Sequence, residues 1–217
     1  MRQPCCGLAP EGMPFIFLAA LATVVFALAE WTGTSLVGLG MVAFVLNFFR
    51  DPERVIPQDP DIAVAPADGR VVRIDTLPDP ISGAPRQVVC IFMNVFNVHV
   101  NRIPIAGKIL SMHYIPGKFF NASLDKASTD NERCVLEVEE HSGARFIVVQ
   151  IAGLIARRIV DWVRPGDVLA RGERFGMIRF GSRVDLYLPP EYEASIPVGA
   201  KTVAGQSVVA RKRMSQE

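Results

Sequence analysis

One long apolar stretch near the start of the chain limits what the chain can fold into. From Pro14 to Phe49 the only charged residue is Glu30, and a polar link around it separates two apolar runs, residues 15–29 and 36–49. Each run is shorter than the roughly 20 residues that a helix needs to cross a bilayer. We therefore predict that residues 1–57 form a hydrophobic helical hairpin and its linker, which anchor the chain to a membrane.

Two other interpretations of this stretch stay open at the level of sequence. A secretory signal peptide would account for Arg2, the first apolar run and the small residues at 27–29. A helix pair buried in a soluble fold would account for both runs. The hairpin is favoured because the second run follows the first directly, which a cleaved signal does not require. Arg2 before the hairpin, with Arg50 and Arg54 after it, places both ends on the cytoplasmic face of the cell membrane.

Beyond Pro57 the chain changes to short runs rich in valine and isoleucine, separated by glycine, proline and aspartate. Such runs are typical of strands joined by tight turns. Many short strands with little helix favour a mainly β domain over residues 58–217, built as a compact sandwich or barrel. The only long stretch with helical character is 119–131. The predicted strands are 69–75, 87–93, 99–103, 108–114, 135–140, 145–151, 168–170, 177–180, 184–188 and 207–211.

Three segments of this domain share a rhythm of turn, short strand and glycine. They are residues 67–72, 165–172 and 198–206, and they resemble the interlocked hairpins of biotinyl or lipoyl carrier domains. A carrier domain needs an exposed lysine at its modified hairpin tip, and Lys201 lacks the Met-Lys or Asp-Lys setting expected there. The likeness therefore concerns the architecture only.

Charge and cysteine usage exclude several classes of function. The formal net charge is +1, whereas a nucleic-acid-binding domain shows a basic bias. The four cysteines form no Cys-x-x-Cys pair and no histidine cluster accompanies them, so we expect neither a metal site nor a disulfide framework. A reducing compartment is the simpler expectation.

The segment Phe180-Gly181-Ser182 lies between two alternating apolar runs, which places it at a strand-to-strand turn. Glycine tolerates backbone angles that other residues avoid. In such a turn the Ser182 hydroxyl can attack the Gly181 carbonyl if a base removes its proton and donors stabilise the oxyanion. Elimination then leaves dehydroalanine, and hydrolysis gives a pyruvoyl group, which can form a Schiff base with an amine and accept electrons. Gly-Ser alone is a common dipeptide, so the remaining residues have to support this chemistry.

Self-cleavage needs a base near Ser182, and His99 is the best candidate of the three histidines. It lies in an alternating segment with Asn97 and Asn101, and all three would share one strand face. Asp68 precedes Gly69 in a tight turn, where local grounds favour a structural role for the aspartate. Arg157, Arg158 and Lys118 are candidates for binding an anionic head group.

Taken in order and at this spacing, the motifs resemble the phosphatidylserine decarboxylase proenzymes, specifically their short, membrane-anchored prokaryotic type. The resemblance covers most of the chain. Its pieces are Glu11-Gly12, Phe48-Phe49-Arg50-Asp51-Pro52-Glu53-Arg54, Pro66-Ala67-Asp68-Gly69-Arg70-Val71, Asn97-Val98-His99-Val100-Asn101-Arg102, Gly117-Lys118-Phe119, Asp125-Lys126-Ala127, Asn131-Glu132-Arg133, Gln150-Ile151-Ala152-Gly153, Ala156-Arg157-Arg158-Ile159 and Phe180-Gly181-Ser182-Arg183-Val184.

The resemblance implies autocatalytic scission between Gly181 and Ser182. A β chain of residues 1–181 would stay bound to an α chain of residues 182–217 headed by a covalent pyruvoyl group, with neither metal nor pyridoxal phosphate. A higher oligomer is left open, and the lipid substrate would be phosphatidylserine in the membrane. Asp68 and Ser182 match family positions, and His99 matches the first of two histidines in longer members. Arg102 stands at the second, and an arginine is a poor base.

The pathway implied is decarboxylation of phosphatidylserine to phosphatidylethanolamine, with His99 reprotonating the carbanion. Two alternatives stay open at this stage. A pyruvoyl decarboxylase of a soluble amino acid would keep the cleavage but would not need the apolar N-terminus. A non-enzymatic membrane adaptor with a carrier-like β domain would remain a single intact chain.

Overall fold

The computed structural model describes residues 7–118, 130–153, 158–179 and 181–213. Contacts divide the chain into two compact units, Met1–Glu53 and Arg54–Glu217. Most of the stretch with predicted helical character, 119–131, lies outside the described residues. The mainly β character predicted for the second unit is confirmed by its large antiparallel sheets.

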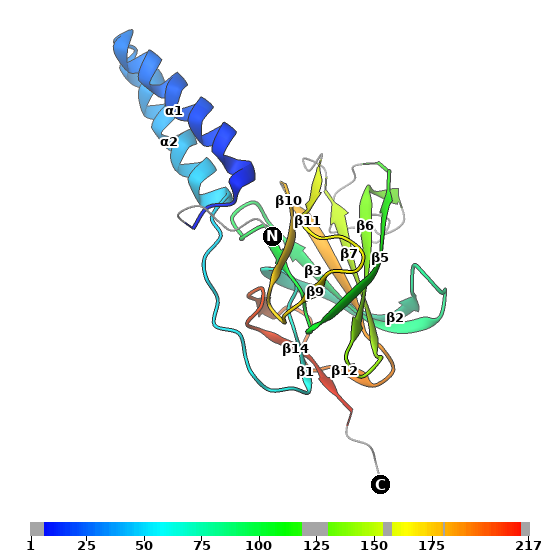
Figure 1. The fold of residues 1–217 in the computed structure, drawn as a ribbon. Helices are drawn as coiled ribbons and strands as arrows, with labels where there is room; N and C mark the ends of the chain where they lie inside the picture. The colour runs from blue at the N-terminus through cyan, green and yellow to red at the C-terminus, as the bar shows by residue number, and fades with distance from the viewer. Residues whose placement is uncertain (1–6, 119–129, 154–157, 180, 214–217) are drawn as a thin grey trace. The chain divides into compact units, whose positions relative to one another are not determined.

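The first unit consists of the short 3₁₀ helix η1 (Pro10–Gly12) and two helices, α1 (Met13–Leu28) and α2 (Thr32–Phe48). Figure 1 shows α1 and α2 side by side. Gly38 on α2 allows this approach, because a Cβ there would lie 2.5 Å from the Thr23 hydroxyl of α1. The helical segment Pro10–Leu28 is long and apolar enough to cross a membrane, since its 19 residues span about 28 Å.

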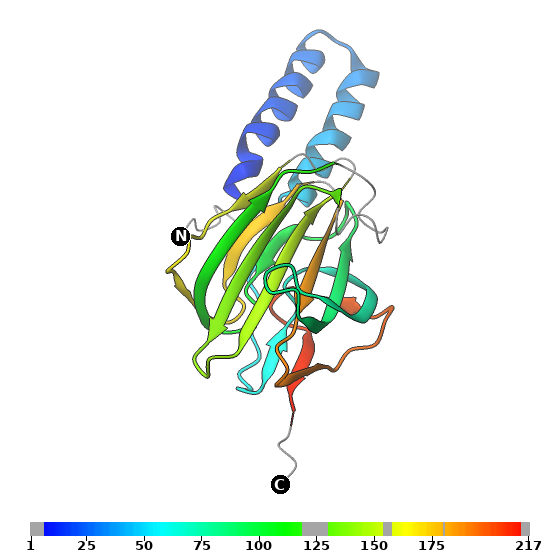
Figure 2. The same ribbon diagram turned by 90° about the vertical axis from the view of Figure 1, so that its right-hand side faces the viewer.

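The second unit contains one eight-stranded sheet and two three-stranded sheets. Their strand orders are β13-β2-β3-β11-β7-β6-β5-β9, β4-β10-β8 and β1-β14-β12, and every pair is antiparallel. Figure 2 shows the long strands of the large sheet running side by side. The strands are β1 (Ile62–Val64), β2 (Gly69–Pro78), β3 (Pro85–Met93), β4 (Val100–Arg102), β5 (Gly107–Ile115), β6 (Arg133–Glu140), β7 (Arg145–Ala152), β8 (Ile159–Asp161), β9 (Val168–Leu169), β10 (Arg174–Ile178), β11 (Ser182–Tyr187), β12 (Tyr192–Ala194), β13 (Lys201–Thr202) and β14 (Val208–Lys212).

Every predicted strand overlaps an observed one, and four short strands were not predicted. These four are β1, β8, β12 and β13, of two or three residues each. They are too short to show an alternating pattern. The finer prediction of a closed sandwich or barrel with carrier-like hairpins stays a prediction.

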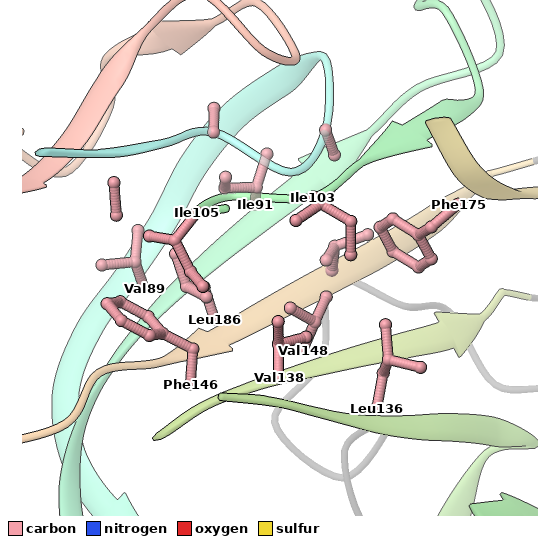
Figure 3. Close-up of a cluster of buried hydrophobic side chains, with 14 of the residues drawn as sticks. Val89, Ile91, Ile103, Ile105, Leu136, Val138, Phe146, Val148, Phe175 and Leu186 are labelled. Carbon is pink, nitrogen blue, oxygen red and sulfur yellow. The ribbon is translucent and has the colours of Figure 1, made fainter. Parts of the chain in front are cut away.

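The main core lies on one face of the eight-stranded sheet. Alternate residues of the long strands point to this face, as the period of two in a strand requires. Figure 3 shows Val89, Ile91, Val148 and Leu186 of the sheet in one apolar cluster, which extends to Phe175 of β10. A smaller apolar cluster on the opposite face includes Val88, Val149 and Tyr187. The strands of the large sheet are therefore buried on both faces in their central part.

Gly69 is fixed by a close backbone approach rather than by the turn chemistry of Asp-Gly. A Cβ on residue 69 would run into the carbonyl oxygen of Phe92 on β3. We predict that Gly69→Ala lowers the free energy of unfolding by about 1–3 kcal/mol, since β2 and β3 would have to move apart. Chemical denaturation would measure the change. Thr76→Ala, at an exposed position of the same strand, should change stability by less than about 0.5 kcal/mol. Equal stability of Gly69→Ala and the wild type would contradict the prediction.

Candidate active site

Ser182 is the first residue of β11, a central strand of the large sheet. It pairs with Met93 of β3 on one side and with Ala152 of β7 on the other. Its side chain is fully buried, and among the described residues its Oγ has no hydrogen-bond partner. A buried hydroxyl without a partner has lost its hydration, which costs about 1–3 kcal/mol, and this cost is unusual in a purely structural serine.

Gly181 has a φ of +60°, in the left-handed region. A residue with a Cβ would be strained there, so glycine is required by conformation. The turn predicted around 181–182 joins β10 and β11, which belong to different sheets. Ser182 itself lies in β11 rather than at the tip of a hairpin.

The strand register brings Asp68 and Ser182 to the same end of the sheet. Arg70 pairs with Phe92, so Gly69 lies level with Met93, and Met93 is opposite Ser182. Gly69, Met93 and Ser182 therefore lie side by side on β2, β3 and β11, and Asp68 directly precedes Gly69. Two strand spacings correspond to ~10 Å between the backbones of β2 and β11.

His99 is held against the segment that leads into Ser182. The Ile178 N–H donates to the His99 carbonyl at 3.3 Å, and only residues 179–181 separate Ile178 from Ser182. The imidazole is fully buried, and its Nδ1 lies 2.9 Å from the carbonyl oxygen of Asn97. A carbonyl oxygen can only accept, so Nδ1 carries the proton and Nε2 is the basic nitrogen of neutral His99.

Asn101 connects His99 with the strands on both sides of β11. Its Oδ1 accepts a bond from Gln150 Nε2 of β7 at 2.9 Å, and its Nδ2 approaches the sulfur of Met93 on β3 at 3.7 Å. Asn101 therefore contacts both strands that flank β11, and His99 lies two residues before it in the segment that leads into β4.

Asp68 contacts groups other than His99. Its carboxylate accepts bonds from the Ala204 N–H at 2.7 Å and from the Arg54 guanidinium at 3.0 Å. The carboxylate is mostly buried, and these contacts connect the turn at 67–69 to two distant segments. The Asn97 carbonyl accepts the hydrogen bond that orients the His99 ring.

The other residues singled out from sequence are distributed as follows. Arg102 is buried and donates to the Gly172 carbonyl at 2.8 Å, a structural contact. Lys118 and Arg158 are exposed. The Lys118 N–H donates to the Asp130 carbonyl at 2.7 Å, and Lys118 is bridged to Asn131, whose side chain donates to the Ala152 carbonyl beside Ser182. Arg157 lies outside the described residues.

An ion pair follows Ser182 directly on β11. Arg183 donates to both oxygens of Asp185 at 2.7 Å, and both side chains are buried on the face opposite Ser182. Such a forked contact fixes the orientation of both groups. The side chain of residue 183, directly after Ser182, is therefore held in a fixed orientation.

Sequence reasoning missed a partly buried acid on β8, Asp161. Burial raises the pKa of Asp161 to about 6, and a hydrogen bond from Cys134 only partly opposes this. Its Oδ1 has no hydrogen-bond partner among the described residues, and a Cβ on Gly176 would lie near both this oxygen and Gln150 Nε2. The acid in the apolar run Ile159-Val160-Asp161-Trp162-Val163 was the available signal. Within the described ranges, no group of three or more histidine, cysteine or acidic side chains could hold a metal ion.

A family model described as phosphatidylserine decarboxylase matches residues 41–210. The chain belongs to the phosphatidylserine decarboxylase family. Three relatives illustrate the similarity, each named phosphatidylserine decarboxylase proenzyme. The protein of Solidesulfovibrio magneticus is 58% identical over 98% of this chain and 99% of its own length. Those of Oleidesulfovibrio alaskensis and Burkholderia ambifaria are 56% and 44% identical, covering 98% and 97% of this chain and 98% of each relative.

Asp161 is not one of the residues for which the sequence predicted a role. Because the pKa of Asp161 is raised by burial, the folded protein binds this proton more tightly than the unfolded chain. Its contribution to stability is therefore present below about pH 4 and is lost as the pH rises to about 6.

We predict that Asp161→Asn stabilises the protein at about pH 7.5 by between about 1 and 3 kcal/mol, because the amide carries no charge to desolvate. At about pH 5 the gain should be much smaller, since the wild-type carboxyl is then largely protonated. Denaturation midpoints at both pH values would measure this. Asp75→Asn is the matched control: a hydrogen bond from Arg73 lowers the pKa of Asp75, so its replacement should bring no gain at either pH. A pH-independent effect of Asp161→Asn would contradict the prediction.

Proposed function

We propose that this chain decarboxylates phosphatidylserine to phosphatidylethanolamine, after cutting itself between Gly181 and Ser182 into a β chain, 1–181, and an α chain, 182–217. The observation that carries the proposal is the buried, unpartnered Ser182 hydroxyl at the start of a central strand, directly after a glycine in the left-handed region. The family of the chain and the names of its relatives support the substrate.

Self-cleavage uses groups of the chain itself. The Ser182 Oγ attacks the Gly181 carbonyl carbon, and the amide nitrogen leaves as the ester forms. A base then removes the Cα proton of residue 182, and the Gly181 carboxylate departs to leave dehydroalanine. Addition of water and loss of ammonia convert this residue to the pyruvoyl group. His99 Nε2 is our candidate for the base, and Asp68 is the second candidate at the same end of the sheet.

The pyruvoyl group supplies an electron sink for the pair of electrons that carbon dioxide leaves behind. The residues fit such a group, because the new chain end would replace a side chain that already lies buried and without a partner. After loss of carbon dioxide, the substrate carbon needs a proton. His99 is our candidate donor, since a proton taken up at Nε2 can be delivered to this carbon while Nδ1 stays bonded to Asn97.

The α chain is held by strand pairing on several sides. β11 lies between β3 and β7, β13 pairs with β2, and β14 pairs with β1. A cut before Ser182 breaks none of these ladders. The two chains should therefore stay together without a covalent bond, as a heterodimer of one gene product.

We propose that the helix pair anchors the enzyme at the cytoplasmic face of the cell membrane. The exposed apolar side chains of α1 and α2, among them Phe17, Leu18 and Val37, support this, because such side chains are costly to leave in water. An anchored enzyme meets a substrate whose acyl chains keep it in the bilayer. Lys118, Arg157 and Arg158 remain our sequence-based candidates for contacts to its anionic head group.

We predict that Ser182→Ala yields one uncut chain of 23.8 kDa that makes no ethanolamine lipid, because no hydroxyl is present to attack Gly181. Intact-mass spectrometry and thin-layer separation of lipids would measure both results. Ser195→Ala removes an exposed hydroxyl of the same α chain and should be cut and active like the wild type. Decarboxylation by uncut Ser182→Ala would rule the mechanism out.

We predict that His99→Asn slows decarboxylation by about 100-fold or more in whatever fraction of the protein is cut, because the proton donor is gone. Gel densitometry gives the cut fraction, and release of labelled carbon dioxide per cut chain gives the rate. Slow cutting as well would assign the cleavage base to His99, whereas normal cutting would favour Asp68. His113→Asn, at an exposed position, is the control. An unchanged rate per cut chain would remove His99 from the mechanism.

A further inference from the structure

A polar groove of about 550 Å³ opens beside the strand ends that carry Asp68. It lies within the second unit, and two basic side chains line it, Arg70 of β2 and Lys201 of β13. Two amides, Asn94 and Asn97, contribute to its wall. These residues lie outside the set proposed above for the head group. The groove is therefore a separate candidate for binding an anion.

Arg70 and Lys201 are directly opposite each other in the antiparallel ladder of β2 and β13. Like charges in that arrangement repel and destabilise a sheet. Both side chains are exposed, and among the described residues neither has an acidic partner. An anion bound between them would relieve the repulsion, and a guanidinium beside an ammonium suits the oxygens of a phosphodiester.

Asp68 does not cancel this positive charge. Of the described residues that line the groove, only Asp68 is acidic, and its carboxylate already accepts hydrogen bonds from Arg54 and the Ala204 N–H. The positive charge of Arg54 offsets the negative charge of Asp68, so no negative charge remains to offset those of Arg70 and Lys201. The groove is thus positive although the whole chain has a formal net charge of only +1.

The rim of the groove carries an exposed aromatic ring. Phe96 is 66% exposed and is presented by a turn that two side-chain contacts stabilise. Asn94 N–H donates to Asn97 Oδ1, and Phe96 N–H donates to Asn94 Oδ1, both at 2.9 Å. A small soluble anion would leave this apolar ring in contact with water, whereas the glycerol and acyl portion of a phospholipid would cover it.

The groove borders the candidate active site through shared residues. Asn97, in its wall, provides the carbonyl that orients His99, and Asn94 follows Met93, the residue opposite Ser182. Arg70 and Ser182 project from opposite faces of the sheet, since Arg70 is aligned through Phe92 with Arg183. A lipid head group would therefore lie across the strand ends, with phosphate on the Arg70 side and serine toward residue 182.

We propose that Arg70 and Lys201 form a subsite for the phosphodiester of the phospholipid substrate, with Phe96 contacting the portion next to its acyl chains. This inference rests on the proposed function. It assigns the phosphate to these two cations, and not to Lys118 or Arg158, whose exposed side chains line neither this groove nor its rim.

The test uses the full-length, self-cut enzyme and dihexanoyl phosphatidylserine dissolved as monomers, so that no charged bilayer is present. Arg70→Gln and Lys201→Gln should each lower kcat/KM by about tenfold, mainly through KM, because each removes one charged contact to the phosphate. The fraction of self-cut chain should stay at the wild-type level. Lys108→Gln removes an exposed charge at the opposite end of the sheet and should leave kcat/KM unchanged.

Three outcomes would overturn the inference. Unchanged kcat/KM for both variants on dissolved substrate would do so, even if their activity on phosphatidylserine vesicles fell, since the groove would then only attract a charged surface. A loss of kcat/KM that occurred only in Lys118→Gln or Arg158→Gln would show that the phosphate binds outside the groove. An equally large loss of kcat/KM in Lys108→Gln would show that removing any positive charge slows the enzyme. If the wild type itself releases no carbon dioxide from phosphatidylserine, the proposed function fails first, which separates the two failures.

Discussion

The candidate active site depends on the pairing of β11 with a strand on each side. Ser182 begins this strand, so backbone hydrogen bonds from β3 and β7 determine where its hydroxyl lies. A serine on a surface loop would sample many orientations and would expose its oxygen to water. Here the Oγ is enclosed, and Gly181 supplies the one backbone conformation that a side chain would disfavour.

The sheet that contains β4 is connected to this arrangement through a single amide, Asn101. Asn101 contacts Gln150 of β7 and Met93 of β3, the two neighbours of β11, and so fixes the segment that carries His99. Each of these polar groups is buried, and a buried amide that lost its partner would be costly. The hydrogen bonds therefore specify how the two sheets face each other, while the apolar core supplies most of the stabilisation.

Much of the fold could be predicted because its long strands have strong local patterns. The alternation in residues 145–151 and 184–188 identifies strands without any knowledge of their partners. Pairing is different, because it joins residues far apart in the chain. Nothing local places Gly69, the neighbour of Asp68, level with Ser182, or Lys201 opposite Arg70. The motif Asp68-Gly69 was predicted as a turn; a bend at residues 66–68 leads directly into β2, and Gly69 is required by the nearby carbonyl of Phe92, a contact that the sequence does not reveal. Asp161 was missed because one acid in a short strand gives no periodic signal.

The central position of β11 also has a kinetic consequence. Before the cut, an unfolded molecule can refold by a first-order process, since all strands share one polymer. After a cut ahead of Ser182, β11 and its neighbours β3 and β7 belong to different molecules, and reassembly becomes second order. At low concentration the separated pieces would rarely meet again. The lifetime of the mature enzyme would then be set by how slowly its strands come apart, and no longer by an equilibrium between folded and unfolded forms.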